Sequence, residues 1–412
     1  MTENSDQGRA RWLVLVAAFL GWMFDGLEMG IFPLIARPAL QDLLGVTGDA
    51  DVGKWFSIIT ALFLVGAALG GLVFGWLGDR IGRVRAMALS ILTYSLFTGV
   101  CYFATAPWHL GALRFVAALG MGGEWSLGVA LVMEVWPEKH RPMLAAAIGA
   151  AANVGFALIA ILGRMIPVTR ESWRWVMLAG ALPALLVFFI RLFVPESERW
   201  KRSVQESASR PIREVFAPKL IKRTLLAIAF ASIALIGTWG SVQWLPLWAD
   251  QMTRGELPQA KATTAILSAL GAVVGCFFGA LTGGALGRRP AYFALCLTSL
   301  VLCGALFRTV TEYNTVFLIL VFAVGCFTAA FYGWFPLYLP ELFPTRVRAT
   351  GQGLSYNFGR ILAAAGALGQ GQLVAHYGGS YAQAGATITL IYLVGLILIW
   401  FAPETKGKPL PE

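Results

Sequence analysis

Long apolar runs alternate with short polar segments along almost the whole chain. An α-helix needs about 20 apolar residues to cross roughly 30 Å of hydrocarbon. The alternation predicts an all-α membrane protein with twelve transmembrane helices. The runs lie near residues 12–35, 55–77, 86–105, 109–133, 143–166, 173–194, 224–248, 262–286, 290–310, 315–338, 350–374 and 382–401.

The composition argues against a soluble enzyme. Hydrophobic residues make up 58% of the chain and charged residues only 13%, whereas soluble domains carry about a quarter charged residues. The net charge of +10 does not indicate nucleic-acid binding, because the basic residues lie in short clusters between apolar runs. The five cysteines lie inside apolar runs without metal-ligand spacing. We expect contact with a lipid bilayer, no nucleic acid, no metal, no cofactor and no enzymatic activity.

The distribution of Lys and Arg predicts the orientation in the membrane. If the N-terminus is cytoplasmic, 21 of the 32 Lys and Arg lie in inner loops and 8 lie in outer loops or at the outer ends of spans. The opposite orientation would violate the positive-inside rule. We expect a multi-pass monomer of the cell (inner or plasma) membrane, with both termini in the cytoplasm.

The two halves of the sequence repeat one another. The spacing ExxPxxxR begins at Glu134 and returns at Glu341, 207 residues later. The tripeptide PES at 195–197 returns as PET at 403–405. Such repeats are typical of transporters in which one half rocks against the other around a central site. The predicted divisions are an N-terminal six-helix bundle at 1–195, a cytoplasmic linker at 196–223, a C-terminal six-helix bundle at 224–402 and a cytoplasmic tail at 403–412.

Several motifs resemble one transporter family. The segment GWLGDRIGR at 75–83 resembles the loop motif of the major facilitator superfamily. DGLE at 25–28, GGEW at 122–125 and YNFGR at 356–360 are similar to segments of its sialate and lactate proton symporters, within the branch that includes sugar porters. The resemblance implies proton-coupled symport of a small organic anion, such as a monocarboxylate, by alternating access. The alternatives are a sugar or polyol symporter and a nontransporting receptor of the same fold.

Charged residues inside the predicted spans are functional candidates, because each costs at least about 2.5–3.5 kcal/mol to insert. Asp25 and Glu28 share a face of the first span, and Arg114 in the fourth span has the reach to meet either carboxylate. The family resemblance assigns proton coupling to Asp25 with Arg114, with Glu28 as the alternative proton site. Glu124 either relays protons or accepts hydrogen bonds from neighbouring segments.

Arg360 is the candidate ligand of the substrate. It lies near the middle of the eleventh span without an acidic partner there, and a guanidinium binds a carboxylate bidentately. The alternative is an internal ion pair with Asp25, Glu28 or Glu124. Tyr356 and Asn357 lie beside Arg360 on the same helix. The other residues predicted to line the substrate site are Asn153, Trp239, Gln243 and Trp334.

The resemblance also implies a charge network that closes the cytoplasmic side. Gly284 occupies the position where the second repeat would need the aspartate found at 79, so we expect an asymmetric network. The alternative is a set of basic residues that only anchors the protein by the positive-inside rule. The candidate gating residues are Asp79, Arg80, Arg83, Glu134, Arg141, Glu196, Arg199, Glu341 and Arg348.

Overall fold

The computed structural model describes residues 2–45, 50–165, 168–206, 210–254 and 256–412. Throughout these ranges the regular secondary structure is helical, and ten of the described helical segments are long and apolar enough to span a membrane. The last residue of the fifth predicted span, 166, and residues 207–209 of the predicted linker lie outside the described ranges.

The first six predicted spans form the N-terminal half of the molecule. Its sixth span is split into two helices because Pro183 lacks the N–H that would continue the first of them. The helices are α1 (Thr2–Leu44), α2 (Ala50–Ile81), α3 (Arg83–Val100), α4 (Pro107–Val135), α5 (Arg141–Met165), α6 (Trp173–Ala179) and α7 (Ala184–Phe193).

The C-terminal half repeats this plan after the two short helices α8 (Glu198–Glu206) and α9 (Pro211–Val215). Its first and last spans are each broken once. With α15 and the α6–α7 pair added to the ten apolar segments, the prediction of twelve spans is confirmed. The helices are α10 (Ile221–Gly240), α11 (Leu245–Met252), α12 (Pro258–Leu286), α13 (Arg288–Thr309), α14 (Thr315–Leu342), α15 (Arg348–His376), α16 (Tyr381–Ile388) and α17 (Ile391–Leu398).

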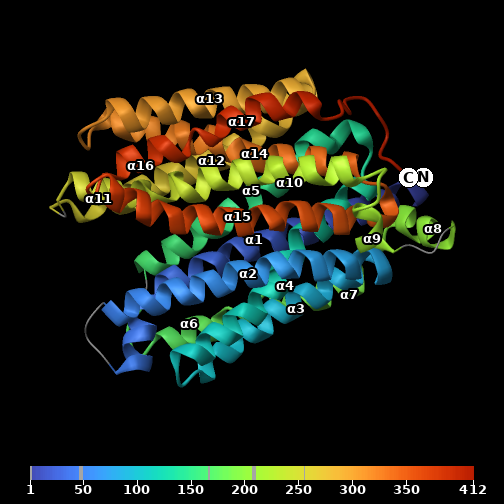
Figure 1. The fold of residues 1–412 in the computed structure, drawn as a ribbon. Helices are drawn as coiled ribbons and strands as arrows, with labels where there is room; N and C mark the ends of the chain where they lie inside the picture. Colours follow the sequence, from blue (N-terminus) through green and yellow to red (C-terminus); the bar gives the residue numbers. More distant parts are fainter. Residues whose placement is uncertain (1, 46–49, 166–167, 207–209, 255) are drawn as a thin grey trace.

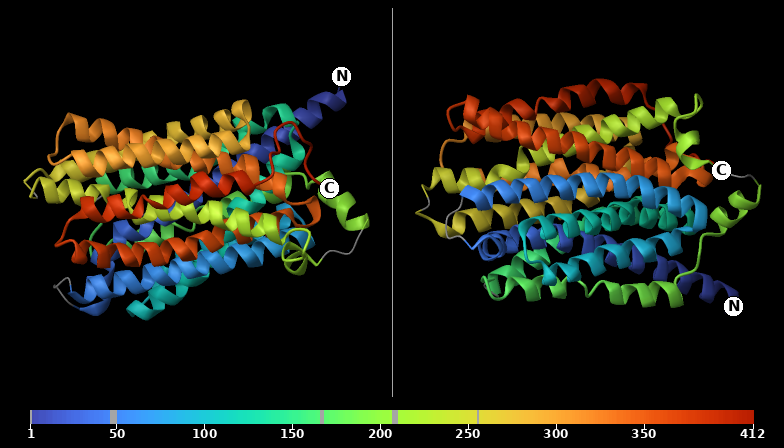
Figure 2. Two further views of the ribbon diagram at one scale, coloured as in Figure 1. Left: turned by 45° about the horizontal axis from the view of Figure 1, so that its top comes forward. Right: turned by 60° about the horizontal axis from the view of Figure 1, so that its bottom comes forward.

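The long helices run side by side, and both ends of the chain lie at the same end of the bundle, beside α8 and α9 (Figures 1 and 2). We call this the termini end. The halves meet where α2 packs on α15 and where α5 packs on α12 and α14. A Cβ atom on Gly353 of α15 would lie 2.3 Å from the carbonyl oxygen of Gly71 in α2, so the two backbones approach closely through small residues.

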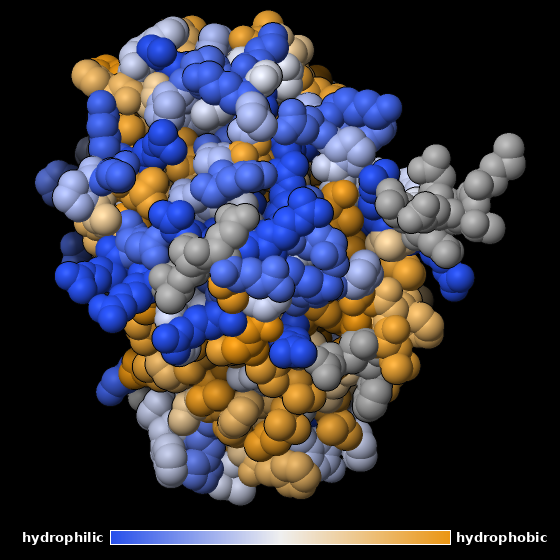
Figure 3. Space-filling view, turned by 90° about the vertical axis from the view of Figure 1, so that its right-hand side faces the viewer, coloured by the Kyte–Doolittle hydropathy of each residue, from blue (hydrophilic) through white to orange (hydrophobic). Residues whose placement is uncertain are grey.

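The outer surface has the character expected of a protein surrounded by lipid. On α2, exposed apolar side chains recur every three or four residues, at Leu62, Val65, Leu69 and Val73. Such a stripe has no aqueous partner and suits hydrocarbon. By contrast, hydrophilic residues gather over the middle of the termini end (Figure 3).

Candidate functional site

An ion pair buried in the N-terminal half joins α1 to α4. Arg114 donates a hydrogen bond to Glu28, and the hydroxyl of Thr98 in α3 donates to the same carboxylate oxygen at 2.8 Å. The Arg114 guanidinium also lies 4.6 Å from the ring centroid of Phe63. Both charged side chains are buried.

This pairing corrects the assignment of Arg114 to Asp25. Glu28 lies three residues further along α1 than Asp25, about 4.5 Å further from the termini end. Arg114 enters α4 from the opposite end of the bundle, so its guanidinium meets Glu28 first.

Asp25 and Glu124 form a second buried acidic group, without hydrogen bonds. Within the described part of the chain, none of their four carboxyl oxygens has a hydrogen-bond partner. Glu28 lies three residues from Asp25 on the same helix, and Trp22, one turn before Asp25, lies 6.0 Å from Cζ of Arg360. Gly21 makes room for this arrangement, because a Cβ atom there would lie 1.8 Å from Oε1 of Glu124.

Arg360 is buried in α15 and is oriented by its own helix. Its Nη1 donates to Oδ1 of Asn357 at 3.0 Å, and its Cζ lies 5.1 Å from the Tyr356 ring centroid and 6.0 Å from that of Trp22. Among the described residues, no carboxylate forms an ion pair with it. The sequence-based alternative of an internal salt bridge is therefore not what the structure shows. Arg360 borders a small cavity of about 20 Å³, lined also by Leu64, Trp239, Ala363 and Ala364.

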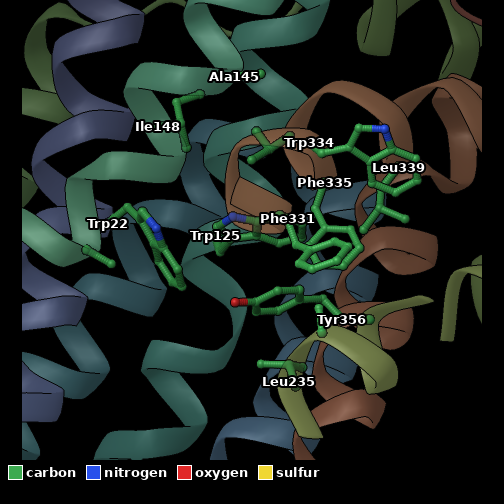
Figure 4. Close-up of a cluster of buried hydrophobic side chains, with 14 of the residues drawn as sticks. Trp22, Trp125, Ala145, Ile148, Leu235, Phe331, Trp334, Phe335, Leu339 and Tyr356 are labelled. Carbon is green, nitrogen blue, oxygen red and sulfur yellow. The ribbon is translucent and has the colours of Figure 1, made fainter. Parts of the chain in front are cut away.

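Tyr356 and Trp22, whose rings lie near this arginine, belong to a cluster of four aromatic rings to which the two halves contribute two each (Figure 4). Trp125 of α4 stacks on Tyr356 of α15, with ring centroids 4.3 Å apart. Trp22 of α1 lies 6.3 Å from Trp125, and Phe335 of α14 meets Tyr356 edge-on at 6.1 Å. Sequence reasoning named only Tyr356. The available signals were that Trp125 follows Glu124 directly and that Trp22 lies one helical turn before Asp25.

Of the other residues predicted to line the site, the structure places Trp239 at this cavity, but not Gln243, Trp334 or Asn153. Gln243 is exposed in a 3₁₀ turn, because α10 ends at Gly240 and the expected alignment with Trp239 is lost. The indole of Trp334 donates to the carbonyl of Arg288 at 3.1 Å. The next residue along α14, Phe335, takes the position facing Tyr356 instead.

Asn153, the remaining predicted lining residue, is half-buried in α5. Its Nδ2 lies 3.8 Å from Sγ of Cys276 in α12. It therefore contacts the opposite half of the molecule but is not among the residues that line the cavity beside Arg360.

At the termini end, acidic residues of the N-terminal half hold the start of α15. Asp79 of α2 accepts hydrogen bonds from the backbone N–H and the hydroxyl of Thr350, at 2.8 and 2.6 Å. Glu134 of α4 accepts from Arg348 at 2.8 Å. Arg83 donates to both carboxylates, at 2.8 Å to Asp79 and 3.1 Å to Glu134. Four predicted gating residues thus form one buried network that crosses between the halves.

The C-terminal half contains the matching contacts within itself. Arg288 donates to the Gly283 carbonyl at 2.8 Å and to Glu341 at 2.6 Å, as Arg83 donates to the Gly78 carbonyl and to Glu134 in the first half. Among the described residues, the crossing contacts of Asp79 have no counterpart in this half, because Gly284 has no carboxylate. A Cβ atom at this position would instead lie 2.7 Å from Pro142 of α5. The expected asymmetry is therefore present.

Three predicted gating arginines lie outside the crossing network. Arg80 is exposed over the ring of Trp76, and Arg141 pairs locally with Glu138 at 3.2 Å. Arg199 is half-buried, and the described residues provide no ion pair for it. Local neighbours decide the orientation of these side chains, which the loop motif does not specify.

Two carboxylates outside the membrane spans occupy equivalent positions in the repeat. Glu196 accepts from the backbone N–H groups of Arg83 and Val84, and Glu404 from those of Arg288 and Arg289. Burial raises the pKa of Glu196 above its ordinary value of 4.5 despite these bonds. Burial also opposes ionisation of Glu404, but four backbone N–H bonds outweigh it and hold the pKa of this carboxyl below 4.5. The pKa values of these two equivalent carboxyl groups are therefore shifted in opposite directions.

Two similar six-helix halves, with buried charges where they meet, define a membrane transporter. The family model of the Major Facilitator Superfamily matches residues 12–367, and the chain belongs to this superfamily.

Named relatives agree with the resemblance found in the motifs. A protein of Cupriavidus pinatubonensis named probable 4-methylmuconolactone transporter is 31% identical over 396 residues, which cover 95% of this chain and 90% of that one. The sialic acid transporter NanX of Escherichia coli is 27% identical over 400 residues, covering 96% and 94%. Among solved structures, the proton:xylose symporter XylE is similar with a TM-score of 0.77 at 18% identity, covering 98% of both chains. This last likeness concerns the fold alone.

Proposed function

We propose that this transporter couples the uptake of a small organic anion to protons, by alternating access across the cell membrane with both termini in the cytoplasm. The observation that carries the proposal is the setting of Arg360. This buried guanidinium has no carboxylate partner among the described residues and borders a cavity near the aromatic rings of both halves. A charge in such a place needs a counter-ion, and a carboxylate fits the guanidinium fork. The anion is therefore the substrate.

The wall beside Arg360 favours a carboxylate with a small apolar body. Its other described members are Leu64, Trp239 and two alanines. Such a wall offers few hydrogen bonds to the many hydroxyls of a sugar or polyol, and unpaired polar groups are costly to bury. The names of the relatives support an organic acid.

The proton is assigned to the pair formed by Asp25 and Glu124. Two ionised carboxylates buried together without hydrogen bonds repel each other and lack solvation, so binding a proton relieves the site. Arg360 lies close to this part of α1, because its Cζ is 6.0 Å from the ring of Trp22, one turn before Asp25. When an anion neutralises Arg360, protonation of Asp25 removes a negative charge that this guanidinium no longer compensates. Anion and proton therefore favour each other's binding, which is the requirement for symport.

The ion pair of Glu28 and Arg114 has a different role in this scheme. Because the two charges already neutralise each other and Thr98 donates to the carboxylate, the pair holds α1, α3 and α4 together. At the termini end, the network around Asp79 and Glu134 closes the path to the cytoplasm. Its crossing bonds open when the halves tilt.

Proteoliposomes test the function directly. Purified protein is offered labelled carboxylates and sugars, with and without an inward proton gradient. We expect gradient-driven accumulation of a carboxylate, and its loss in Arg360→Gln, with partial recovery in Arg360→Lys because lysine keeps the charge but not the fork. Arg213→Gln is the matched control, since Arg213 in α9 is exposed and lies outside the predicted site and gate. Accumulation of sugars alone, or normal anion affinity in Arg360→Gln, would overturn the proposal.

A further inference from the structure

Asn357 makes three hydrogen bonds that use both hydrogens of its amide. Its Nδ2 donates to the carbonyl of Gly122 in α4 and to that of Gly353 in its own helix, each at 2.9 Å. Its Oδ1 accepts from Arg360 at 3.0 Å. The side chain is fully buried. An amide engaged in this way has no free donor for a substrate, although the sequence predicted Asn357 as a substrate ligand.

The amide is also held in place by the neighbouring half. Gly71 of α2 faces it so closely that a Cβ atom there would lie 2.0 Å from Nδ2. Gly122, which accepts the crossing hydrogen bond, lies two residues before Glu124. Asn357 therefore touches the proposed anion ligand on one side and the segment carrying the proposed proton site on the other.

We infer that Asn357 is a positioning residue that makes separation of the two halves depend on anion binding at Arg360. This inference rests on the proposed function. The bond from Asn357 to Gly122 joins the halves and has to break when they move apart at this level. An anion that takes the Nη1 donor of Arg360 removes one of the three bonds that fix the amide. Without the anion, all three bonds fix the amide, and its bond to Gly122 holds the halves together and keeps protons from crossing alone.

The repeat supplies a matched control for Asn357. Asn153 of α5 begins the segment NVG, which echoes the segment NFG at Asn357. Its Nδ2 reaches only Sγ of Cys276, a weak acceptor, at 3.8 Å. Three residues further on, α5 has Phe156 where α15 has Arg360. Replacing Asn153 thus removes the same residue type at an inter-half contact, without an anion ligand attached.

The experiment compares Asn357→Leu and Asn153→Leu in proteoliposomes. Proton entry without substrate is followed with an internal pH dye, and anion KM and maximal rate are measured in the same vesicles. For Asn357→Leu we expect about tenfold faster proton entry without anion, because one lost hydrogen bond carries a factor of this order. We expect KM to stay the same or to fall, because the anion no longer competes with Asn357 for Nη1 of Arg360. Asn153→Leu should stay close to wild type in both. A fall in maximal rate alone, or equal behaviour of the two variants, would overturn the inference.

A second variant and a distance measurement distinguish failure of this inference from misfolding and from failure of the proposed function. If Asn357→Leu does not fold, Asn357→Ser is measured instead, since the small hydroxyl cannot span to Gly122. If wild-type protein transports no carboxylate, the proposed function fails, and the role of Asn357 is then judged from distances. Spin labels replace the exposed residues Arg85 and Leu286 at the termini end, while the five native cysteines stay buried. A longer distance between the two labels in substrate-free Asn357→Leu than in wild type supports the proposed role of the Asn357–Gly122 hydrogen bond. An unchanged distance refutes that role.

Discussion

Glu134 of α4 and Arg348 of α15 form an ion pair that crosses between the two halves of the molecule. Nitrogen and oxygen are 2.8 Å apart, and neither side chain has exposed surface. Glu134 also accepts from Arg83 and from the hydroxyl of Ser197. One carboxylate thus contacts two buried guanidinium groups. Its removal leaves Arg348 without this counter-ion, while Arg83 keeps its pair with Asp79.

Glu134→Gln should both destabilise the protein and open the termini end. Removing one partner of a buried ion pair costs about 3–5 kcal/mol, because the other charge stays buried. Thermal unfolding in detergent measures the stability, and the spin-label distance between positions 85 and 286 measures the opening. Glu198→Gln is the control, because the exposed pair of Glu198 with Lys201 contributes at most about 1 kcal/mol. Similar unfolding temperatures for the two variants would contradict the role of Glu134.

Glu28→Gln and Asp25→Asn should have opposite effects, although the two residues lie three positions apart. Glu28→Gln removes the counter-ion of the buried Arg114, so we expect a large loss of thermal stability. Asp25→Asn removes a carboxylate that has no hydrogen bonds, and should leave stability near or above that of wild type. It should abolish proton-driven accumulation while counterflow exchange continues. Accumulation by Asp25→Asn would exclude this residue as the coupling site.

The sequence predicted the membrane fold well but only part of the site, for physical reasons that particular residues show. The spans follow from the lengths of the apolar runs, and the expected orientation follows from the positions of Lys and Arg between them. Both are local properties of the sequence. The choice of Arg114 between Asp25 and Glu28 depends on the relative depth of two helices, which no local pattern contains. The predicted position of Gln243 was wrong because α10 ends at Gly240, and the residues that follow no longer continue the face of the helix that carries Trp239. Trp22 and Trp125 were missed because aromatic residues are abundant in the chain and only tertiary packing selects these two.

Gly21→Ala should disturb proton coupling more than folding. The added methyl group would lie 1.8 Å from Oε1 of Glu124, so the carboxylate has to swing away from α1. A flexible side chain can make this movement, and the helices need not separate. We expect lower proton-driven accumulation with a small change in unfolding temperature. Gly8→Ala is the control, because a Cβ atom there meets nothing within 4 Å. Wild-type coupling in Gly21→Ala would show that the position of Glu124 is immaterial.

Neutralising the two equivalent carboxylates of the repeat should give opposite pH dependences of stability. The pKa of Glu404 is lowered in the folded protein by its backbone N–H bonds, so its stabilisation is complete above the ordinary value of 4.5 and disappears as the pH falls through the lower folded value. The penalty of Glu404→Gln should therefore shrink below about pH 4.5. The pKa of Glu196 is raised by burial, so ionising it costs stability as the pH rises above 4.5. The penalty of Glu196→Gln should therefore grow as the pH falls. We would measure the unfolding temperatures of wild type and both variants from about pH 7 to about pH 3. If the two variants differed from wild type in the same way at every pH, the opposite pKa shifts of Glu196 and Glu404 would be excluded.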